Sequence, residues 1–227
     1  MARRARVVVP DCPHHITQRG NRRERIFFQP GDENIYLDLM AEQLTKYNIE
    51  CWSYCLMPNH VHFILVPKDE TSLGRAVGEA HRRYTQFIGI RDKWRGHLFQ
   101  GRFYSVAMDE AHLMAAFRYV ALNPVKAKLA EWAIDWPYSS TRAIIDGVSD
   151  KYVNIAPVKK RIPKFAKFLL RENNLDAALW GEIRANEIIG RPVGTKEWLA
   201  RLEKQFAGRV VPKKRGPKAK NINVRKS

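Results

Sequence analysis

The sequence predicts an α+β fold of the ferredoxin-like kind, in which an antiparallel sheet is built in the chain order β-α-β-β-α-β. Short runs of alternating apolar and polar residues indicate strands, and longer runs with apolar residues three and four positions apart indicate helices. Such a sheet packs two helices on one face, so a third helix is expected to cover the other face. A basic, mainly helical and flexible C-terminal extension is expected to follow.

The first half of this pattern lies in residues 14–66. His14 to Gln18 is predicted as a short strand, and Asp32 to Lys46 as a helix because its apolar residues follow helical spacing. Ile49 to Leu56 is predicted as the second strand, and His60 to Val66 as the strand that returns beside it. Proline and asparagine between these two strands are typical of a tight turn.

The second half begins with a helix over residues 71–88, which has a hydroxyl residue at its start to cap it. Leu98 to Ala107 is predicted as the fourth strand, interrupted by Gly101. A third helix is expected from Asp109, its cap, to Leu122. It should end there because the residue before a proline, here Pro124, disfavours the helical conformation.

The composition is strongly basic, with 40 Lys and Arg residues against 23 Asp and Glu residues, a net charge of +17 and a pI near 10.0. This charge favours a polyanionic partner such as a nucleic acid. No apolar run is long enough to span a bilayer and no signal-peptide pattern follows the basic N-terminus, so we expect a cytoplasmic, nucleoid-associated protein with no membrane partner. Three cysteines are too few for a disulfide framework or a four-ligand zinc site.

The positive charge is concentrated in the last third of the chain. Residues 158–227 hold 19 of the Lys and Arg residues and only 6 of the Asp and Glu residues, which leaves residues 1–157 nearly neutral. This asymmetry predicts a catalytic body and a basic appendage. We therefore expect a catalytic domain at residues 1–145, a basic helical extension at 146–208 and a flexible basic tail at 209–227.

Two basic clusters are candidates for contacts with phosphate groups. The tail contains Lys213, Lys214 and Arg215, and it should bind DNA with a salt-sensitive affinity that depends little on sequence. The body has an Arg-rich turn after its first strand, with Arg19, Arg22 and Arg23 around a glycine. A tail that only improves solubility and a turn that is only solvated remain open alternatives.

The strand from His60 predicts a metal site. Alternation along a strand places Val61, Phe63 and Leu65 on one face and His60 and His62 on the other. The apolar face should pack on the two helices, so both imidazoles project from the opposite face, where two nitrogen ligands can hold one metal ion. A pair of ordinary surface histidines is the open alternative.

The residue pattern of the third helix indicates which side chains face these imidazoles. Leu113, Phe117 and Val120 form its core stripe, whereas Tyr119 and Asn123 lie one turn apart on the neighbouring stripe. If this helix covers the histidine face, a phenol and an amide approach the metal site, and Asn123 offers an oxygen as third ligand. An ordinary amphipathic helix remains the alternative.

This set of groups suits the transesterification of a phosphodiester. A divalent ion on a non-bridging oxygen offsets the charge that develops at phosphorus. Tyrosine, with a pKa of about 10, must be activated before it attacks. Mg²⁺ prefers oxygen ligands and two imidazoles suit Mn²⁺, so we expect either ion as the cofactor.

Five stretches of the chain resemble the REP-associated tyrosine transposases, relatives of the single-tyrosine HUH transposases of small insertion sequences. In order, they are His14–Arg23, Tyr54–His62, Gly96–Phe103, Tyr119–Ala127 and Trp136–Ser140. They run through most of residues 1–145, which makes the resemblance specific. Ala121 stands where many members have histidine, and Lys128 stands where glycine is common. Neither departure removes a catalytic group.

The resemblance implies the roles of individual residues. His60-Val61-His62 would be the HUH metal motif, Tyr119 the nucleophile and Asn123 the accessory metal ligand. The expected activity is cleavage and rejoining of single-stranded DNA through a 5′-phosphotyrosine, at repetitive palindromes that fold into hairpins. By the same resemblance, Arg102 is a candidate for binding that DNA, together with Arg19, Arg22 and Arg23.

Two rival functions remain. A metal-dependent amidohydrolase also uses His-x-His on a strand, but it needs a complete barrel, for which the body is too short. The second rival is a non-catalytic nucleic-acid-binding protein that retains the fold. It would have the same basic charge, so charge does not separate the two functions. The short connection between Ala107 and Asp109 favours a monomer with its tyrosine helix in cis over a dimer that exchanges this helix.

Overall fold

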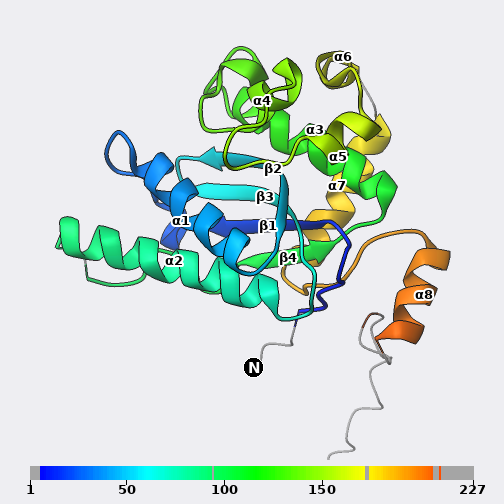
Figure 1. The fold of residues 1–227 in the computed structure, drawn as a ribbon, viewed down its shortest axis with the longest axis horizontal. Helices are drawn as coiled ribbons and strands as arrows, with labels where there is room; N and C mark the ends of the chain where they lie inside the picture. The colour runs from blue at the N-terminus through cyan, green and yellow to red at the C-terminus, as the bar shows by residue number, and fades with distance from the viewer. Residues whose placement is uncertain (1–5, 94, 172–173, 207–209, 211–227) are drawn as a thin grey trace, which may run out of the picture.

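The centre of the molecule is a four-stranded antiparallel sheet, seen in a computed structural model that describes residues 6–93, 95–171, 174–206 and 210. The strands are β1 (His14–Arg19), β2 (Glu50–Met57), β3 (His60–Val66) and β4 (Tyr104–Ala107), and they lie in the order β2-β3-β1-β4 (Figure 1). This is the strand order of the predicted ferredoxin-like sheet, so the predicted fold class is confirmed.

The register between β1 and β3 positions the side chains that matter for the site. Thr17 pairs with His62 and Arg19 pairs with His60, in antiparallel orientation. Because side chains alternate along each strand, His15, Thr17 and Arg19 share one face of the sheet with the two β3 histidines.

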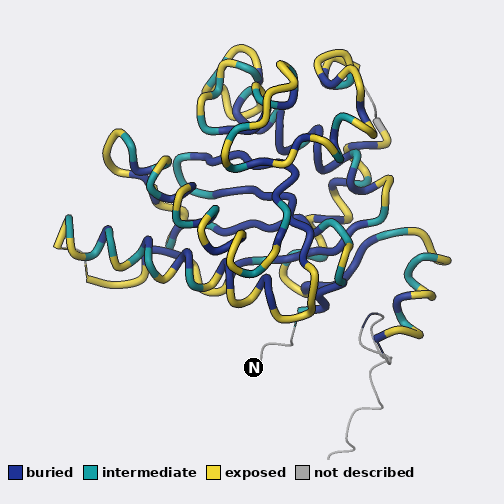
Figure 2. The backbone as a smooth tube through the Cα atoms, in the orientation of Figure 1, coloured by how far each residue is buried: buried dark blue, intermediate teal, exposed yellow. Residues whose placement is uncertain are grey.

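One face of the sheet is covered by α1 (Asp32–Lys46) and α2 (Ser72–Arg91) (Figure 1). Tyr36 of α1 lies against Phe63 of β3 at a ring-centroid distance of 6.2 Å and against Tyr84 of α2 at 5.2 Å. All three rings are buried, and the strands beneath them are buried along most of their length (Figure 2). The apolar face of β3 therefore packs on two helices, as predicted.

The other face is covered by α3 (Glu110–Lys126) and by α7 (Asn174–Glu187), a helix of the C-terminal extension. Leu113, Phe117 and Val120 of α3 are fully buried, which confirms them as the core stripe of this helix. The sequence predicted the cover by α3, whereas the part played by α7 was not anticipated.

Two predicted boundaries were wrong. The strand predicted from Leu98 is only four residues long, because Gly101 has a φ of 125° and the chain before Tyr104 is irregular. The helix α3 continues through Pro124 to Lys126. A proline in the last turn removes only one backbone hydrogen bond and does not end the helix.

Two positions in the connections are constrained by the backbone. A Cβ atom at Gly20, just after β1, would lie 2.2 Å from the carbonyl oxygen of Glu24, so only glycine fits this turn. Lys128, after α3, has a φ of 57°, in the left-handed region. This conformation explains why glycine suits the position, and lysine occupies it here at some cost in strain.

The extension packs against the body. It contains α5 (Ala156–Arg161), α6 (Phe165–Leu170), α7 and α8 (Lys196–Gln205), and α4 (Thr141–Asp146) lies at its boundary with the body. Trp180 and Ile183 of α7 belong to the same buried cluster as the sheet, and Leu202 of α8 packs with Val7 and Val9 in a second cluster. The division of the chain at residue 145 stays a prediction. Among the described residues, no helix is long and apolar enough to cross a membrane.

A buried arginine joins the helix α3 to the extension. Arg118 pairs with Asp176 at the start of α7, and its guanidinium also donates to the carbonyl oxygens of Phe168, Leu169 and Arg171. Both charged side chains are about nine-tenths buried. Such a pair is costly to break, since removal of one partner leaves a buried charge.

We expect Arg118→Ala to lower the free energy of unfolding by about 3–5 kcal/mol, because the Asp176 carboxylate would lose the positive charge that faces it. Arg82→Ala is a matched control: it removes an exposed pair with Glu79 on α2 and should cost less than about 1 kcal/mol. Urea unfolding of both variants measures the difference. Equal effects would contradict the role assigned to Arg118.

Candidate functional site

The two histidines of β3 lie side by side on the face covered by α3 and α7. The ring centroids of His60 and His62 are 4.9 Å apart, and the rings are nearly perpendicular. His62 is almost fully buried, whereas His60 is partly exposed at the edge of the site. The alternation along β3 therefore places both imidazoles together on this face.

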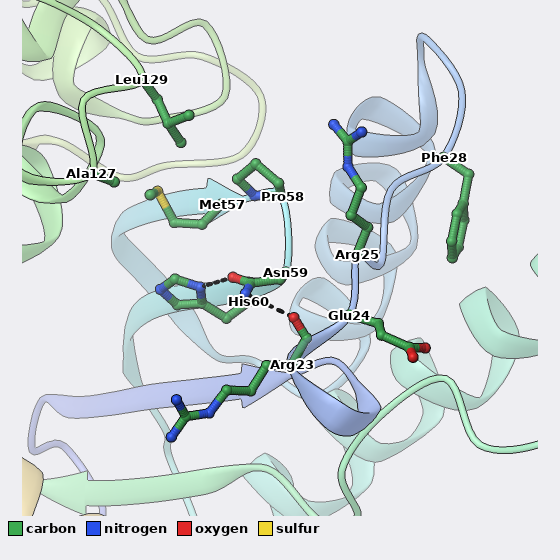
Figure 3. A pocket seen from close by; sticks show the side chains of 10 residues that line it. All are labelled: Arg23, Glu24, Arg25, Phe28, Met57, Pro58, Asn59, His60, Ala127 and Leu129. Carbon is green, nitrogen blue, oxygen red and sulfur yellow. Dashed lines mark hydrogen bonds between the residues drawn. The ribbon is translucent and has the colours of Figure 1, made fainter.

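The orientation of His60 is set by Asn59. The Nδ2 of Asn59 donates to the carbonyl oxygen of Arg23 at 3.0 Å, so its Oδ1 faces the Nδ1 of His60 at 2.6 Å (Figure 3). An amide oxygen only accepts, so this contact requires the proton of His60 on Nδ1. The Nε2 of His60 is then left with its lone pair, as a metal ligand needs.

The Nδ1 of His62 is contacted by another histidine. His15 of β1 places its Nε2 at 2.9 Å from this nitrogen, and the two rings stack at a centroid distance of 5.1 Å. The Nε2 of His62 is buried and has no hydrogen-bond partner among the described residues. A buried polar atom without a partner is uncommon and calls for an explanation such as a missing ligand.

Tyr119 lies next to this pair in the same chain. Its ring is 5.6 Å from the ring of His62, centroid to centroid, in an edge-on arrangement. On its other side, Trp180 of α7 stacks on the phenol with a centroid distance of 3.6 Å and an angle of 14° between the planes. The phenol is therefore enclosed between an imidazole and an indole.

These residues suit a divalent metal ion. Two neutral imidazoles side by side are typical ligands of Mn²⁺ and similar ions. Asn123 lies one turn after Tyr119, and its buried amide nitrogen has no hydrogen-bond partner among the described residues. That nitrogen is a donor, so only the amide oxygen of Asn123 could bind a metal ion. Within the same residues, no group of three His, Cys, Asp or Glu side chains can hold a metal.

Burial controls the protonation of the site. It lowers the pKa of His60 to about 4, together with the charge of Arg19, and holds the pKa of His62 well below its ordinary value. Both imidazoles are thus neutral at pH 7 and free to bind a metal. Burial also raises the pKa of Tyr119, while the positive charge of Arg184 opposes this shift. The phenol therefore needs activation before it can attack.

The helix α7 supplies three groups that the sequence analysis did not assign to the site. Trp180 packs on Tyr119 and on His15. Glu187 accepts a hydrogen bond from Thr17 Oγ1 at 3.1 Å. The positive charge of Arg184 adds to the lowering of the pKa of His62 by burial and opposes the raising of the pKa of Tyr119 by burial. No short-range sequence pattern marks these residues, because their partners lie far away in the chain.

A pocket of about 630 Å³ opens beside His60 (Figure 3). Its wall combines the basic side chains Arg23 and Arg25 with the exposed apolar side chains Phe28 and Leu129. Positive charge binds phosphate, and apolar surface suits the faces of bases. The arrangement is compatible with a nucleic-acid strand that leads to His60.

The predicted DNA-binding residues are placed differently from one another. Arg19 is close enough to influence the pKa of His60, and Arg23 lines the pocket. Arg22 is exposed on the same turn, and Arg102 is exposed on the connection before β4. Lys213, Lys214 and Arg215 lie outside the described residues. Another tyrosine that follows two arginines, Tyr84, could be considered as a nucleophile, but it is fully buried on the opposite face and donates to the Ile26 carbonyl oxygen, so it is a core residue.

The fold and the site together define a class of protein. A ferredoxin-like antiparallel sheet that carries paired imidazoles beside a helix-borne tyrosine is the arrangement of single-tyrosine transposases. The family described as "Transposase IS200 like" matches residues 8–123, and the chain belongs to this family. Membership makes it a DNA-processing enzyme.

Two similar proteins support the resemblance to REP-associated tyrosine transposases. A Haemophilus influenzae protein, a putative member of that group by name, is 29% identical over 133 residues, which cover 51% of this chain and 76% of the relative. A solved structure of a REP-associated tyrosine transposase bound to a REP hairpin has a TM-score of 0.55 and 20% identity. The match covers 69% of this chain and 94% of the other, and it shows the shared fold.

Buried histidines should make the protein sensitive to acid. Burial lowers the pKa of His14 to about 4 and of His81 to about 3. The unfolded chain, with ordinary values near 6.5, then binds more protons than the folded chain between about pH 6.5 and pH 4. We expect the free energy of unfolding to fall through this window, by up to about 1.4 kcal/mol per pH unit for each such histidine.

Urea midpoints between pH 7 and pH 4.5 measure this dependence. His81→Phe should reduce the slope by about one proton. The pKa shift assigned to His81 is wrong if this variant keeps the slope of the unaltered chain.

Proposed function

We propose that this protein cuts and rejoins single-stranded DNA by transesterification, with Tyr119 as the nucleophile. The observation that carries the proposal is the contact between the Tyr119 ring and the ring of His62, whose buried Nε2 has no hydrogen-bond partner among the described residues. Because the tyrosine and the histidines belong to one chain, we also propose that a monomer contains a complete site.

The proposed reaction is the one that the resemblance to REP-associated tyrosine transposases implies, and the proximity of Tyr119 to His62 supports it. The phenolic oxygen of Tyr119 attacks a phosphorus atom of the strand, and the bond from phosphorus to the 3′ oxygen breaks. The products are a 5′-phosphotyrosine and a free 3′ hydroxyl group, which takes up a proton in exchange for the one that the phenol lost. The reverse attack by a 3′ hydroxyl group restores the phosphodiester without ATP, because the phosphotyrosine conserves the bond energy.

His60 and His62 are proposed to hold a divalent metal ion, Mg²⁺ or Mn²⁺, with Asn123 as a third protein ligand. The bound ion would neutralise charge on the phosphate group and make the phenol more acidic. The protein contributes the rest: the neutral imidazoles are oriented before any ligand binds, and Arg184 favours the phenolate over the phenol.

The pocket beside His60 is the proposed path of the DNA strand. Arg23, which lines the pocket, and Arg19, whose charge acts on His60, would contact phosphate groups, and Phe28 and Leu129 offer apolar surface to the bases. A hairpin-forming palindrome is the proposed substrate. Two findings support it: the chain's membership of the transposase family, and the REP hairpin that is bound in the similar solved structure.

One observation favours a second function, that of a DNA-binding protein without catalysis. Trp180 covers the phenol of Tyr119, and the Nε2 of His62 is closed off from solvent. Trp180 therefore covers one face of the phenol, although Tyr119 as a whole is only half-buried. Both functions include DNA binding, so only a covalent product distinguishes them.

We expect Tyr119→Phe to abolish the covalent adduct between the protein and a labelled hairpin strand, while binding of the same hairpin persists. The substitution removes the attacking oxygen and keeps the ring that stacks on Trp180. The measurement is adduct formation with a pool of single-stranded hairpins in Mn²⁺ or Mg²⁺, followed by sequencing of the cut site.

Tyr84→Phe is the control for this experiment. It removes the hydroxyl group of a buried core tyrosine, which should cost about 1 kcal/mol of stability and leave the adduct intact. Loss of the adduct in Tyr84→Phe but not in Tyr119→Phe would show that the wrong tyrosine was assigned. No adduct in the unaltered chain would favour the non-catalytic function.

His60→Ala and His62→Ala should each abolish cleavage, because one remaining imidazole binds a divalent ion much more weakly than two. Titration with Mn²⁺, followed by electron paramagnetic resonance, should show loss of the bound ion in both variants. The exposed His97 provides the control, since His97→Ala should bind Mn²⁺ and cleave DNA like the unaltered chain. Cleavage that persists in either β3 variant, with metal present, would argue against the metal site.

A further inference from the structure

The proposed chemistry leaves one buried imidazole of the site without a role. His15 lies on β1, is fully buried, and faces the same side of the sheet as the two β3 histidines. Its Nε2 contacts the Nδ1 of His62 at 2.9 Å, a good hydrogen-bond distance. His15 also lies under Trp180, which meets it edge-on at a centroid distance of 4.9 Å.

The contact between the two imidazoles must contain one proton, which allows two arrangements. In the first, His15 donates to His62. Since His62 is neutral, its own proton must then be on Nε2, which is buried and has no partner among the described residues. A buried N–H group without an acceptor costs about 1–3 kcal/mol, so this arrangement is unfavourable.

In the second arrangement, His62 donates from Nδ1 and His15 accepts on Nε2. The proton of His15 is then on Nδ1, and the nearest oxygens are Glu187 Oε1 at 3.5 Å and Thr17 Oγ1 at 3.4 Å, the latter also 3.3 Å from the Nε2 of His15. Both contacts are long, and Thr17 Oγ1 is shared between the two ring nitrogens. The second arrangement is favoured over the first because its buried N–H group has acceptors nearby, whereas an N–H group at the Nε2 of His62 would have none among the described residues. It also leaves the Nε2 of His62 with its lone pair.

The same logic applies to His60, whose Nδ1 donates to Asn59 and whose Nε2 is free. Two different partners, one an amide oxygen and the other an imidazole, thus select the same tautomer in both β3 histidines. Partners of this kind orient metal-binding imidazoles and make them better donors to the ion.

We propose that His15 is a positioning residue of the site: it accepts the Nδ1 proton of His62 and so presents the Nε2 of His62 as the ligating nitrogen. This inference rests on the proposed metal site, but it concerns a hydrogen bond that exists without the metal. His15 touches neither the substrate nor the ion, and it acts only through His62.

The neighbouring Thr17 is the competing partner for His62. Its Oγ1 lies 3.5 Å from the Nδ1 of His62, longer than the contact to His15, and its proton is directed to Glu187. This distance is at the limit of a hydrogen bond. His15 is therefore the better acceptor on geometry.

The tautomer of His62 is the direct test. In the metal-free, full-length protein labelled with ¹⁵N-histidine, a long-range ¹H–¹⁵N correlation spectrum at pH 7 shows which ring nitrogen carries the proton. We expect the proton of His62 on Nδ1. A proton on Nε2 in the unaltered chain would overturn the proposal without any variant.

Two substitutions separate the hydrogen bond from the packing. His15→Phe keeps a ring and removes the acceptor, so we expect His62 to lose its single tautomer and the affinity for Mn²⁺ alone to fall about 10- to 100-fold. His15→Gln places an amide oxygen near the position of Nε2, so it should restore the tautomer and most of the affinity. A merely structural role would not be rescued in this way.

His14→Phe is the matched control. His14 is the adjacent histidine, equally buried, and it bonds to the backbone of Val9 and Cys12 away from the site. This variant should keep the tautomer of His62 and the Mn²⁺ affinity, with thermal melting used to compare the folding of all variants. Equal losses in His14→Phe and His15→Phe, or no loss in His15→Phe, would overturn the proposal.

Two further outcomes separate a failure of the His15 proposal from a failure of the proposed metal site. If Thr17→Val changes the tautomer of His62 and His15→Phe does not, Thr17 is the partner and the proposal is wrong. If the unaltered chain binds no Mn²⁺, the proposed metal site fails, but the tautomer in the metal-free protein still decides whether His15 orients His62.

Discussion

The alternation of side chains along β3, combined with its pairing to β1, is the constraint on which the site depends. Phe63 faces the core formed with α1 and α2, so His60 and His62 must face the other side. The pairing then brings Thr17 and Arg19 beside them. A slip by one residue would turn both imidazoles into the apolar core. The interactions that determine the sheet therefore also determine the position of the candidate site.

The second face differs from the first because it buries polar groups, and each of these groups requires a partner. Asn59 and His15 satisfy the Nδ1 atoms of the two β3 histidines. The extension covers the site with Trp180 and Glu187. The ion pair between Arg118 of α3 and Asp176 of α7 joins the extension to α3. Burial keeps the imidazoles neutral and the phenol protonated, which is the state in which a metal ion has most to contribute.

The accuracy of the sequence-based predictions depended on the length of each pattern. The helix at Asp32–Lys46 and the strand at His60–Val66 have the predicted boundaries, because each has a periodic pattern bounded by turn residues or a cap. The predicted start of the fourth strand and the predicted end of α3 were wrong. The effect of Gly101 and of Pro124 on the chain depends on the conformation of the backbone around them, which the sequence pattern does not give. The proximity of Tyr119 to His62 followed from the expectation that α3 covers the histidine face.

The sequence by itself determined the order of the elements, the faces of β3 and α3, and the basic character of the chain, because these properties follow from local periodicity and composition. Only the tertiary structure decided that His15 contacts His62, 47 positions away, and that Trp180 lies on Tyr119. These contacts depend on strand register and on how a distant helix packs over the sheet. No local pattern encodes them, because each partner alone looks like an ordinary buried residue.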